Sequence, residues 1–587
     1  MFLLRTIILT AVLGWCTTAP VYAATAYYVS PIGNDANNGL SSATPWQTLA
    51  KISATPFAPG DSINLDAGHD AFRGCLNLTG YLIHSTVNQP LVIRPYNGTP
   101  WSLYSTCGAA GNKQTAAITI DSVQGLTLQN GYLNGNSPVA PTTFGVFIRS
   151  WDTRVSQGNA GLLFQDMETV DFNTTATNAA SAHFMVTGIN RGIAGITIQR
   201  VKMHGLLPTS PDDNGITGYG SGQNVTGAKY LNNQIYNIGG RSGVLQNSGN
   251  TGNGIWINGT GPASGTALAL GTGAEVAGNY IHDISANVAG CGGSIGIATY
   301  NSSGAWIHGN EIARVLPTTW VKSNCDFAGI DIDGISQYTL VEGNYTHRNA
   351  GPGWQTAPVA QPWTFNIFRN NMSVNDGSFG GSANGFGAAA NGGFASHNNT
   401  IYVGLNQTNG SFVNCYTTGF NVAYASGASL VANNICINLA SQWGGWSDFV
   451  SDQWQINTNP SALTLRNNAY QGSTTGGNLF GPWLVNGGNN YYWSLAAFQA
   501  ATGEETGSMI AAPQLATPGT EPTCFGAAAP CPAGYLVRVG APVIGKGVNL
   551  SSPPYNLPTP STDYFGHPFT VWNIGADASM PNSTALK

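Results

Sequence analysis

One short pattern recurs along the middle of this chain and constrains its fold more than any other feature. The pattern spans six residues: position 1 is apolar, position 3 is Gly or Asn, position 4 is Asn, and position 6 is apolar in most copies. It occurs at 230–235, 276–281, 307–312, 341–346, 368–373, 431–436 and 465–470. Degenerate copies lie around Gly131, Met167, Val201 and Asn399. Successive copies are 27 to 36 residues apart, with one interval of 46. A recurring period of this length indicates a solenoid in which each repeat forms one coil.

The residue types inside each repeat indicate strands. Alternating runs such as Gly-Val-Phe-Ile-Arg at 145–149, Gly-Ile-Trp-Ile-Asn at 254–258 and Gly-Ile-Asp-Ile-Asp at 329–333 are separated by Gly and Asn. A period of two is typical of β-strands, and the signatures of leucine-rich, ankyrin and helical repeats are missing. We therefore predict an all-β, right-handed, single-stranded parallel β-helix with three short strands per coil and inward Ile, Val and Leu. Eleven marked coils at a spacing of about 4.8 Å predict a rod about 50 Å long.

The recurring Asn predicts a structural column. Asn tolerates the left-handed turns between strands, and its amide can bind an identical amide in the next coil. We expect these side chains to support the fold and not to carry chemistry.

The N-terminus predicts export. Residues 1–23 carry one positive charge at Arg5, an apolar run from Ile7 to Trp15 and a Val-Tyr-Ala ending, which is typical of a cleaved signal peptide. That run is too short to span a bilayer, and no later stretch reaches the roughly 18 to 20 apolar residues needed. We therefore expect a secreted protein, extracellular or periplasmic, with no membrane span. Only 8% of residues are charged and the net charge is -6, so nothing indicates nucleic-acid binding.

Eight cysteines remain after this signal, and an even number in an oxidising compartment predicts disulfides. Neighbours in sequence suggest the pairs Cys75–Cys107, Cys291–Cys325, Cys415–Cys436 and Cys524–Cys531. The second pair has a further argument. Cys291 lies four residues before Ile295 and Cys325 lies five before Ile330, so the two cysteines would occupy nearly equivalent points one coil apart. The spacing between neighbouring strands fits disulfide geometry.

Two terminal segments resemble a known superfamily. Residues 27–35 (YYVSPIGND) with 45–49 (PWQTL), and residues 541–547 (APVIGKG) with 563–567 (DYFGH) and 573–576 (NIGA), resemble the opening and closing segments of bacterial right-handed β-helix proteins of the pectate-lyase superfamily. The resemblance implies an N-terminal cap, a rod and a C-terminal cap. We assign 24–115 to the N-terminal cap and first coils, 116–475 to the β-helix and 476–587 to the C-terminal coils and cap.

Acidic residues gather in one segment of a chain in which acids are scarce. Ile330 and Ile332 must point inward, so alternation turns Asp331 and Asp333 outward on one face, and Asp326 leads into the same strand. Two outward acids separated by one residue lie about 6 to 7 Å apart, within reach of a glycosidase pair. They could equally hold calcium through oxygen ligands, or be solvated strand residues.

Neighbouring coils predict a sugar-binding surface around these acids. We expect Trp256, Asn258 and Tyr300 below the acids, and Trp354 with Gln355 above, because aromatic side chains beside carboxylates suit sugar stacking. Two further candidates follow the next Asn mark. His347 is a candidate catalytic residue and Arg348 a candidate substrate contact, although His347 shares its offset of three from the Asn mark with His204 and His282, which favours a structural column.

Two further resemblances concern the acidic segment. The order of coils is similar to that of family-nine pectate lyases. That resemblance would imply a calcium cage and a lysine base, but here the corresponding strand carries acids, and the nearest lysine is Lys322. The segment also resembles a β-helix group with an Asp-x-Asp-Gly strand followed by His-x-Asn-x-Gly-Pro-Gly. His347, Asn349 and 351–353 match, whereas Arg348 and Ala350 stand where many of that group carry acids.

These observations predict a carbohydrate-active protein whose partner is a polysaccharide or cell-surface glycan. The first hypothesis is a glycoside hydrolase in which Asp331 and Asp333 are the acid and the base or nucleophile. A second hypothesis is a calcium-assisted polysaccharide lyase with Lys322 or Arg348 as base. A third is a noncatalytic glycan-binding or structural rod. Calcium is a possible cofactor, and no dedicated metal ligands are predicted.

Overall fold

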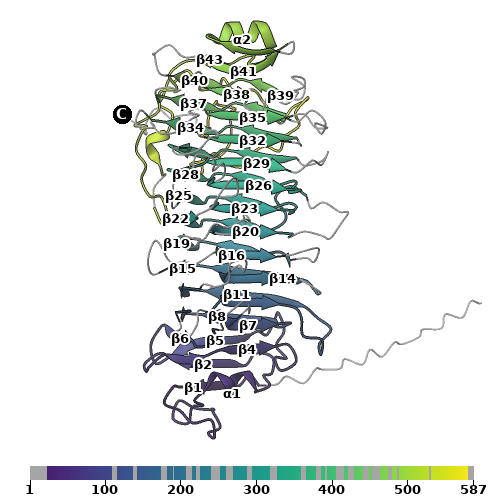
Figure 1. The fold of residues 1–587 in the computed structure, drawn as a ribbon, viewed down its shortest axis with the longest axis vertical. Coiled ribbons are helices and arrows are strands. Elements are labelled where there is room, and N and C mark those ends of the chain that lie inside the picture. The colour runs from purple at the N-terminus through teal and green to yellow at the C-terminus, as the bar shows by residue number, and fades with distance from the viewer. Residues whose placement is uncertain are drawn as a thin grey trace, which may run out of the picture.

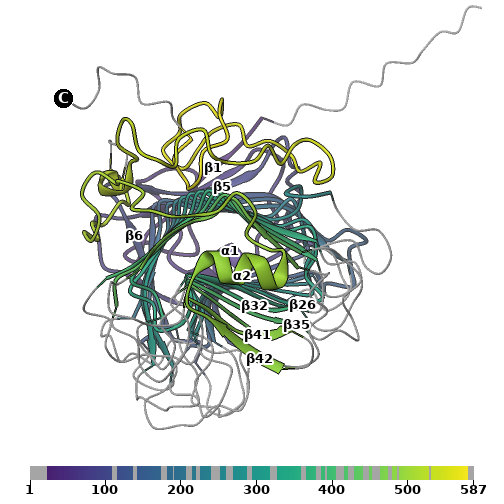
Figure 2. The ribbon, with the colours of Figure 1, turned by 90° about the horizontal axis from the view of Figure 1, so that it is seen from above.

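The computed structural model describes residues 23–108, 115–136, 142–172, 181–188, 191–205, 214–219, 225–239, 252–259, 269–286, 294–317, 327–358, 365–377, 385–390, 393–404, 415–420, 429–440, 449–452, 463–472, 479–485, 488–527 and 531–578. These residues form a right-handed parallel β-helix, as predicted (Figure 1). Three long sheets run along the rod, and seen from above they enclose a common interior (Figure 2).

Most coils contribute one strand to each sheet, with two exceptions. One coil contributes both β17 (Val225–Thr226) and β18 (Lys229–Leu231) to sheet 1, and β42 (Gly488–Tyr492) in sheet 2 pairs antiparallel with β41 (Phe480–Val485). Sheet 1 is β1 (Ala26–Val29), β2 (Ser62–Asp66), β5 (Leu91–Tyr96), β8 (Gln124–Gln129), β11 (Asn159–Gln165), β14 (Ile193–Gln199), β17 (Val225–Thr226), β18 (Lys229–Leu231), β21 (Glu275–Ala277), β24 (Trp306–His308), β27 (Leu340–Glu342), β30 (Asn366–Arg369), β33 (Phe394–His397), β36 (Ser429–Ala432) and β39 (Leu463–Arg466). Sheet 2 is β4 (Leu76–Thr79), β7 (Ala116–Asp121), β10 (Phe144–Arg149), β13 (Ala182–Thr187), β16 (Asn214–Tyr219), β20 (Asn253–Asn258), β23 (Ile297–Tyr300), β26 (Ile330–Gly334), β29 (Trp354–Pro358), β32 (Phe386–Ala390), β35 (Tyr416–Phe420), β38 (Val450–Asp452), β41 (Phe480–Val485) and β42 (Gly488–Tyr492). Sheet 3 is β3 (Phe72–Gly74), β6 (Trp101–Ser105), β9 (Gly131–Asn134), β12 (Glu168–Val170), β15 (Lys202–His204), β19 (Gln234–Gly239), β22 (Tyr280–Ala286), β25 (Glu311–Pro317), β28 (Tyr345–His347), β31 (Met372–Val374), β34 (Thr400–Val403), β37 (Ile435–Asn438), β40 (Ala469–Gly472) and β43 (Met509–Ile510).

The stack has more coils than the Asn marks predicted. Sheet 3 contains 14 parallel strands among the described residues, whereas the sequence marked eleven coils. The additional coils lie at the two ends, where the turns do not carry the Asn pattern. The predicted divisions at residues 115 and 475 remain predictions.

Apolar side chains fill the interior of the coil stack. Ile255, Ile297 and Ile330 pair in register on successive strands of sheet 2, and each is fully buried. The register corrects one expectation, because Ile297 and not Ile295 pairs with Ile330. Burying such side chains contributes about 1.5 to 3 kcal/mol each, so the inward column is a main source of stability.

The predicted Asn column is a continuous hydrogen-bonded ladder. The ladder runs through Asn233, Asn279, Asn310, Asn344, Asn371, Asn399, Asn434 and Asn468. The amide oxygen of Asn233 accepts the backbone N–H of Val201, and each later oxygen accepts the backbone and side-chain N–H groups of the Asn one coil earlier. Each of these amides also donates to a backbone carbonyl of an earlier coil. All eight side chains are buried, so the ladder satisfies backbone groups that water cannot reach.

Two buried carboxyls terminate Asn ladders. Glu505 accepts from the amide of Asn468 at 3.1 Å, at the end of the main ladder. A second, shorter ladder ends at Asp376, which accepts from the backbone and side chain of Asn349 at 2.9 Å. Burial raises the pKa of each carboxyl to about 7, against the hydrogen bonds that lower it.

The pKa of Asp376 predicts a pH dependence of stability. An aspartate in an unfolded chain has a pKa of about 3.9, so between pH 4 and 7 the folded chain binds the extra proton. The stabilisation of the folded state by this proton is complete below pH 4. It is lost as pH rises to 7, and the free energy of unfolding falls by up to about 1.4 kcal/mol per pH unit. Asp376→Asn mimics the neutral acid and should remove this part of the slope. Thermal melts of both proteins from pH 4 to 8 check it; an unchanged slope in the variant would contradict the assignment.

Helices lie at the two ends of the stack. Helix α1 (Leu49–Ser53) begins after Thr48, whose hydroxyl accepts the N–H of Lys51. Helix α2 (Leu495–Thr502) crosses the other end, where Phe498 is fully buried and stacks on Phe480 with ring centroids 4.6 Å apart (Figure 2). No helix in the described ranges is long and apolar enough to cross a membrane.

The last part of the chain returns along the outside of the rod (Figure 1). We call residues 512–578 the C-terminal strap; it includes the 3-10 helix η3 (Ala533–Tyr535). Strap side chains Tyr535, Val543 and Ile574 pack with Met372 and Ile435 on the outer face of sheet 3. The strap therefore covers the later coils with a second apolar layer.

Three of the four predicted disulfides are present. Cys75–Cys107, Cys415–Cys436 and Cys524–Cys531 are bonded, with Cα atoms 6.0, 5.9 and 5.4 Å apart. Cys291 and Cys325 lie outside the described residues, so that pair stays a prediction.

Candidate active site on the outer face of sheet 2

Strand β26 directs the two candidate acids outward, as alternation predicted. Ile330 and Ile332 are fully buried in the main core, and Asp331 and Asp333 lie on the opposite side of the strand. Gly334 follows at φ +64°, where a Cβ atom would lie 2.6 Å from the Asn301 amide oxygen. Glycine therefore lets the chain turn away immediately after the second acid.

The strand register builds the surroundings of the acids. Trp256, Ala298, Asp331 and Gln355 occupy one outward row across β20, β23, β26 and β29. Asn258, Tyr300 and Asp333 occupy the next outward row across β20, β23 and β26. The predicted neighbours Trp256, Asn258, Tyr300 and Gln355 thus share one surface with both acids. We call this surface the acid face.

The two acids have different surroundings. Asp331 is only 3% exposed and lies one strand from an apolar cluster of Trp256, Ile295 and Ala298. Asp333 is partly exposed, and its Oδ1 accepts the N–H of Gly334 at 2.6 Å. The possibility that both acids are simply solvated strand residues is therefore wrong for Asp331.

One predicted member of this surface points the other way. Trp354 pairs in register with inward Ile330, is fully buried and belongs to the main core. Its predicted outward position is wrong, because β29 begins at Trp354 in the same inward phase as β26 at Ile330. Gln355 takes the outward position beside Asp331.

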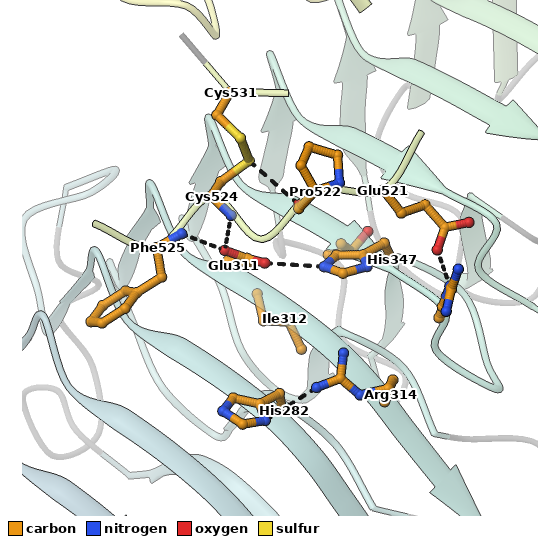
Figure 3. A network of polar contacts seen from close by, with 12 residues as sticks. His282, Glu311, Ile312, Arg314, His347, Glu521, Pro522, Cys524, Phe525 and Cys531 are labelled. Carbon is orange, nitrogen blue, oxygen red and sulfur yellow. Dashed lines mark hydrogen bonds and ion pairs between the residues drawn. A yellow bond between two sulfur atoms is a disulfide. The ribbon is translucent and has the colours of Figure 1, made fainter. Parts of the chain in front are cut away.

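His347 and Arg348 do not lie with the acids. His347 ends β28 in sheet 3, is buried, and its Nε2 lies 3.1 Å from Glu311 Oε1. Glu311 Oε2 in turn accepts the strap N–H groups of Cys524 and Phe525 at 2.7 Å, as Figure 3 shows. His347 shares its register column with His282, so the predicted structural column is confirmed.

The side chain of Arg348 also turns to the strap. Its backbone has φ +56°, and its guanidinium forms an ion pair with Glu521. Arg348 lies in neither outward row of the acid face, and its contact with the substrate stays a prediction. Lys322 and Asp326 lie outside the described residues.

One cluster in the described part of the chain has metal-binding residue types. Potential ligand atoms of Asp563, His567 and Asp577 lie within 4.8 Å of one another. The oxygens of Asp563 already accept the backbone N–H groups of Phe565, His567 and Ala578 and contact the His567 ring. This cluster closes the end of the strap, and it does not involve the acid face.

Sequence reasoning missed two features near these residues. Ile295 and Ala298 pack with Trp256 on the acid face. Alternation with inward Ile297 was a signal for Ala298, but it would turn Ile295 inward, and Ile295 precedes β23. The pairing of Glu311 with the strap had no local signal, because its partners lie 213 and 214 residues later.

No protein-family model and no curated protein matches this chain. Solved structures similar to it include GH136 lacto-N-biosidase from Eubacterium ramulus, with 15% identity and a TM-score of 0.34. The match covers 66% of this chain and 65% of that chain. The GH87 α-1,3-glucanase from Streptomyces thermodiastaticus has 14% identity, a TM-score of 0.39 and coverages of 68% and 66%. Pectate lyase Pel9A has 12% identity, a TM-score of 0.29 and coverages of 95% and 97%. The chain thus spans slightly under two thirds of the first two proteins, and none of these similarities assigns a family.

Proposed function

We propose that this chain is a secreted glycoside hydrolase that cleaves a polysaccharide on the acid face, with Asp331 and Asp333 as its catalytic pair. The observation that carries the proposal is the outward placement of two carboxyls on β26 in unlike surroundings, one buried beside an apolar cluster and one partly exposed. Hydrolysis needs one carboxyl that gives a proton and one that is ionised, and unlike surroundings let a pair divide these roles.

The spacing of the pair suits the reaction. Residues i and i+2 of a strand lie about 6 to 7 Å apart, which overlaps the roughly 6.5 to 9.5 Å of inverting enzymes and exceeds the roughly 5 to 5.5 Å of retaining enzymes. In either case one carboxyl protonates the glycosidic oxygen as the bond to the anomeric carbon breaks. The other carboxyl either removes a proton from the attacking water or attacks the anomeric carbon itself, and water later releases the sugar.

The neighbouring side chains suit a sugar substrate. Tyr300 is partly exposed beside Asp333, and Trp256, 8% exposed, lies two strands from Asp331 in the same outward row. Aromatic faces stack on the apolar face of a pyranose, while Asn258 and Gln355 offer amides to its hydroxyls.

A product assay across a panel of polysaccharides tests this function. The full-length protein is incubated with each polysaccharide in calcium and in chelator, and both reducing ends and ultraviolet absorbance are followed. We expect new reducing ends, no unsaturated product and no effect of chelator. Unsaturated, ultraviolet-absorbing products would identify a lyase instead. Binding without any product would identify a noncatalytic rod, and either result overturns the proposal.

A further inference from the structure

A pocket lies away from the acid face, between sheet 3 and the tip of the C-terminal strap. Its volume is about 540 Å³, within the range of small-molecule sites. Turn residues between sheets 1 and 3 form its floor, and strap residues 524–526 with Tyr564 line one end. We call it the strap pocket.

The floor of the strap pocket is distinguished by its glycines. The turn residue before each ladder Asn has a positive φ, and in four later coils it is Asn370, Asn398, Asn433 and Asn467. Each of these four amides donates to a strap carbonyl at 2.9 or 3.0 Å. The three preceding coils carry Gly278, Gly309 and Gly343 at this turn, and all three line the pocket.

The positive φ alone does not explain these glycines. Both Gly and Asn adopt the left-handed conformation, and Asn does so in the coils on either side. A Cβ atom at Gly309 or Gly343 would have no atom nearer than 4.0 Å, so packing does not require glycine there either. The glycines leave the pocket floor as bare backbone, open to a close ligand.

The tip of the strap is held rigidly over one end of this floor. Glu311 binds two of its N–H groups, and the Cys524–Cys531 disulfide closes the loop (Figure 3). The fixed tip presents Phe525, which is 40% exposed and stacks on Tyr280 with centroids 5.5 Å apart. An exposed, pre-positioned aromatic ring is a low-entropy contact for a ligand.

Polar groups of the pocket indicate a neutral, hydroxyl-bearing ligand. The charged groups of the lining are of opposite sign. Arg200 is paired with Asp166, and Lys202 shares the lining with Glu311, which is held by His347 and the strap. Gln234 contributes an amide. The hydroxyl of Tyr345, also in the lining, is buried and has no hydrogen-bond partner among the described residues.

We propose that the strap pocket is a second carbohydrate-binding site, which takes a neutral sugar residue of a polysaccharide. The sugar's apolar face stacks on Phe525, its ring lies over the glycine floor, and its hydroxyls bind Gln234. The site anchors a long chain and takes no part in cleavage.

Affinity electrophoresis tests this site in the full-length protein. Native gels contain xylan, mixed-linkage β-glucan, galactomannan or dextran as probes, and an Asp333→Asn background limits cleavage during the run. Gly309→Asn places an amide in the floor at a φ that Asn adopts in neighbouring coils, and Phe525→Ala removes the aromatic wall. Gly195→Asn, at φ +64° outside the pocket, and Tyr491→Ala, equally 40% exposed, are the matched controls.

We expect at least one probe to retard the parent, with Gly309→Asn and Phe525→Ala each weakening the apparent affinity tenfold or more. Both controls should migrate like the parent, and all variants should melt within about 2 °C of it. Retardation unchanged in both pocket variants, or equally lost in the controls, overturns the site. The two proposals fail separately. Cleavage by the wild type with unaltered binding in the pocket variants rejects only this site, and pocket-dependent binding without cleavage rejects only the hydrolase.

Discussion

Asp331→Asn and Asp333→Asn are each expected to lower kcat/KM on the polysaccharide substrate by two or more orders of magnitude. Asn cannot give or take the proton that glycosidic cleavage needs, and loss of a positioned acid or base typically costs 10² to 10⁴ in rate. The measurement is initial rates at matched substrate concentrations. Asp70→Asn, an exposed acid near the start of the rod, is the control and should keep full activity.

Stability should separate from activity in these variants. Asp333 is partly exposed, so its exchange for Asn should change the free energy of unfolding by under about 0.5 kcal/mol. Asp331 is buried and its exchange should have a larger effect on melting, although Asn preserves its shape. Variants that melt like the parent and keep full activity would show that the acids do not act in catalysis. A loss of stability together with a calcium dependence would make them metal ligands.

Among the variants proposed, Asn344→Ala is expected to cause the largest loss in the free energy of unfolding. The Asn344 oxygen accepts the backbone N–H of Asn310 at 3.1 Å and its amide at 2.9 Å, and both groups are buried. Each unsatisfied buried donor costs about 1 to 3 kcal/mol, so the two together cost about 2 to 6 kcal/mol. Urea unfolding followed by circular dichroism measures this loss.

A matched control separates the ladder from the turn beside it. Asn232→Gly replaces an exposed Asn that has φ +55°, which Gly adopts readily, and it should leave stability nearly unchanged. Hydrogen exchange should locate the loss in the coils around Asn344, because each coil contacts mainly its neighbours. Equal stability of Asn344→Ala and the parent would show that the ladder contributes little.

Local periodicity was sufficient to predict the fold and the direction of the acids. Alternation fixed Ile330 and Ile332 inward, and the spacing of Asn marks located the buried ladder. Trp354 and Gln355 were both expected on the acid face, but adjacent residues of a strand point to opposite sides, and β29 begins at Trp354 in the inward phase. A strand that shifts by one residue reverses every side chain, and sequence alone does not fix that start.

The strap could not be predicted from local pattern. Its contacts join residues far apart in sequence, such as Arg369 with Pro558 and Asn433 with Val548. Burial of Asp331 likewise depends on neighbours from other coils. Alternation along a strand predicts which way a side chain points. It does not predict which residues of other coils cover that side chain.

A crystal structure of the Asp333→Asn variant, soaked with an oligosaccharide released from the substrate that the panel identifies, tests the central claim most directly. The account predicts a sugar across β20, β23, β26 and β29, with its glycosidic oxygen within hydrogen-bonding distance of a position 331 or 333 side chain. A fully occupied sugar elsewhere on the rod, with the acid face empty, would contradict it.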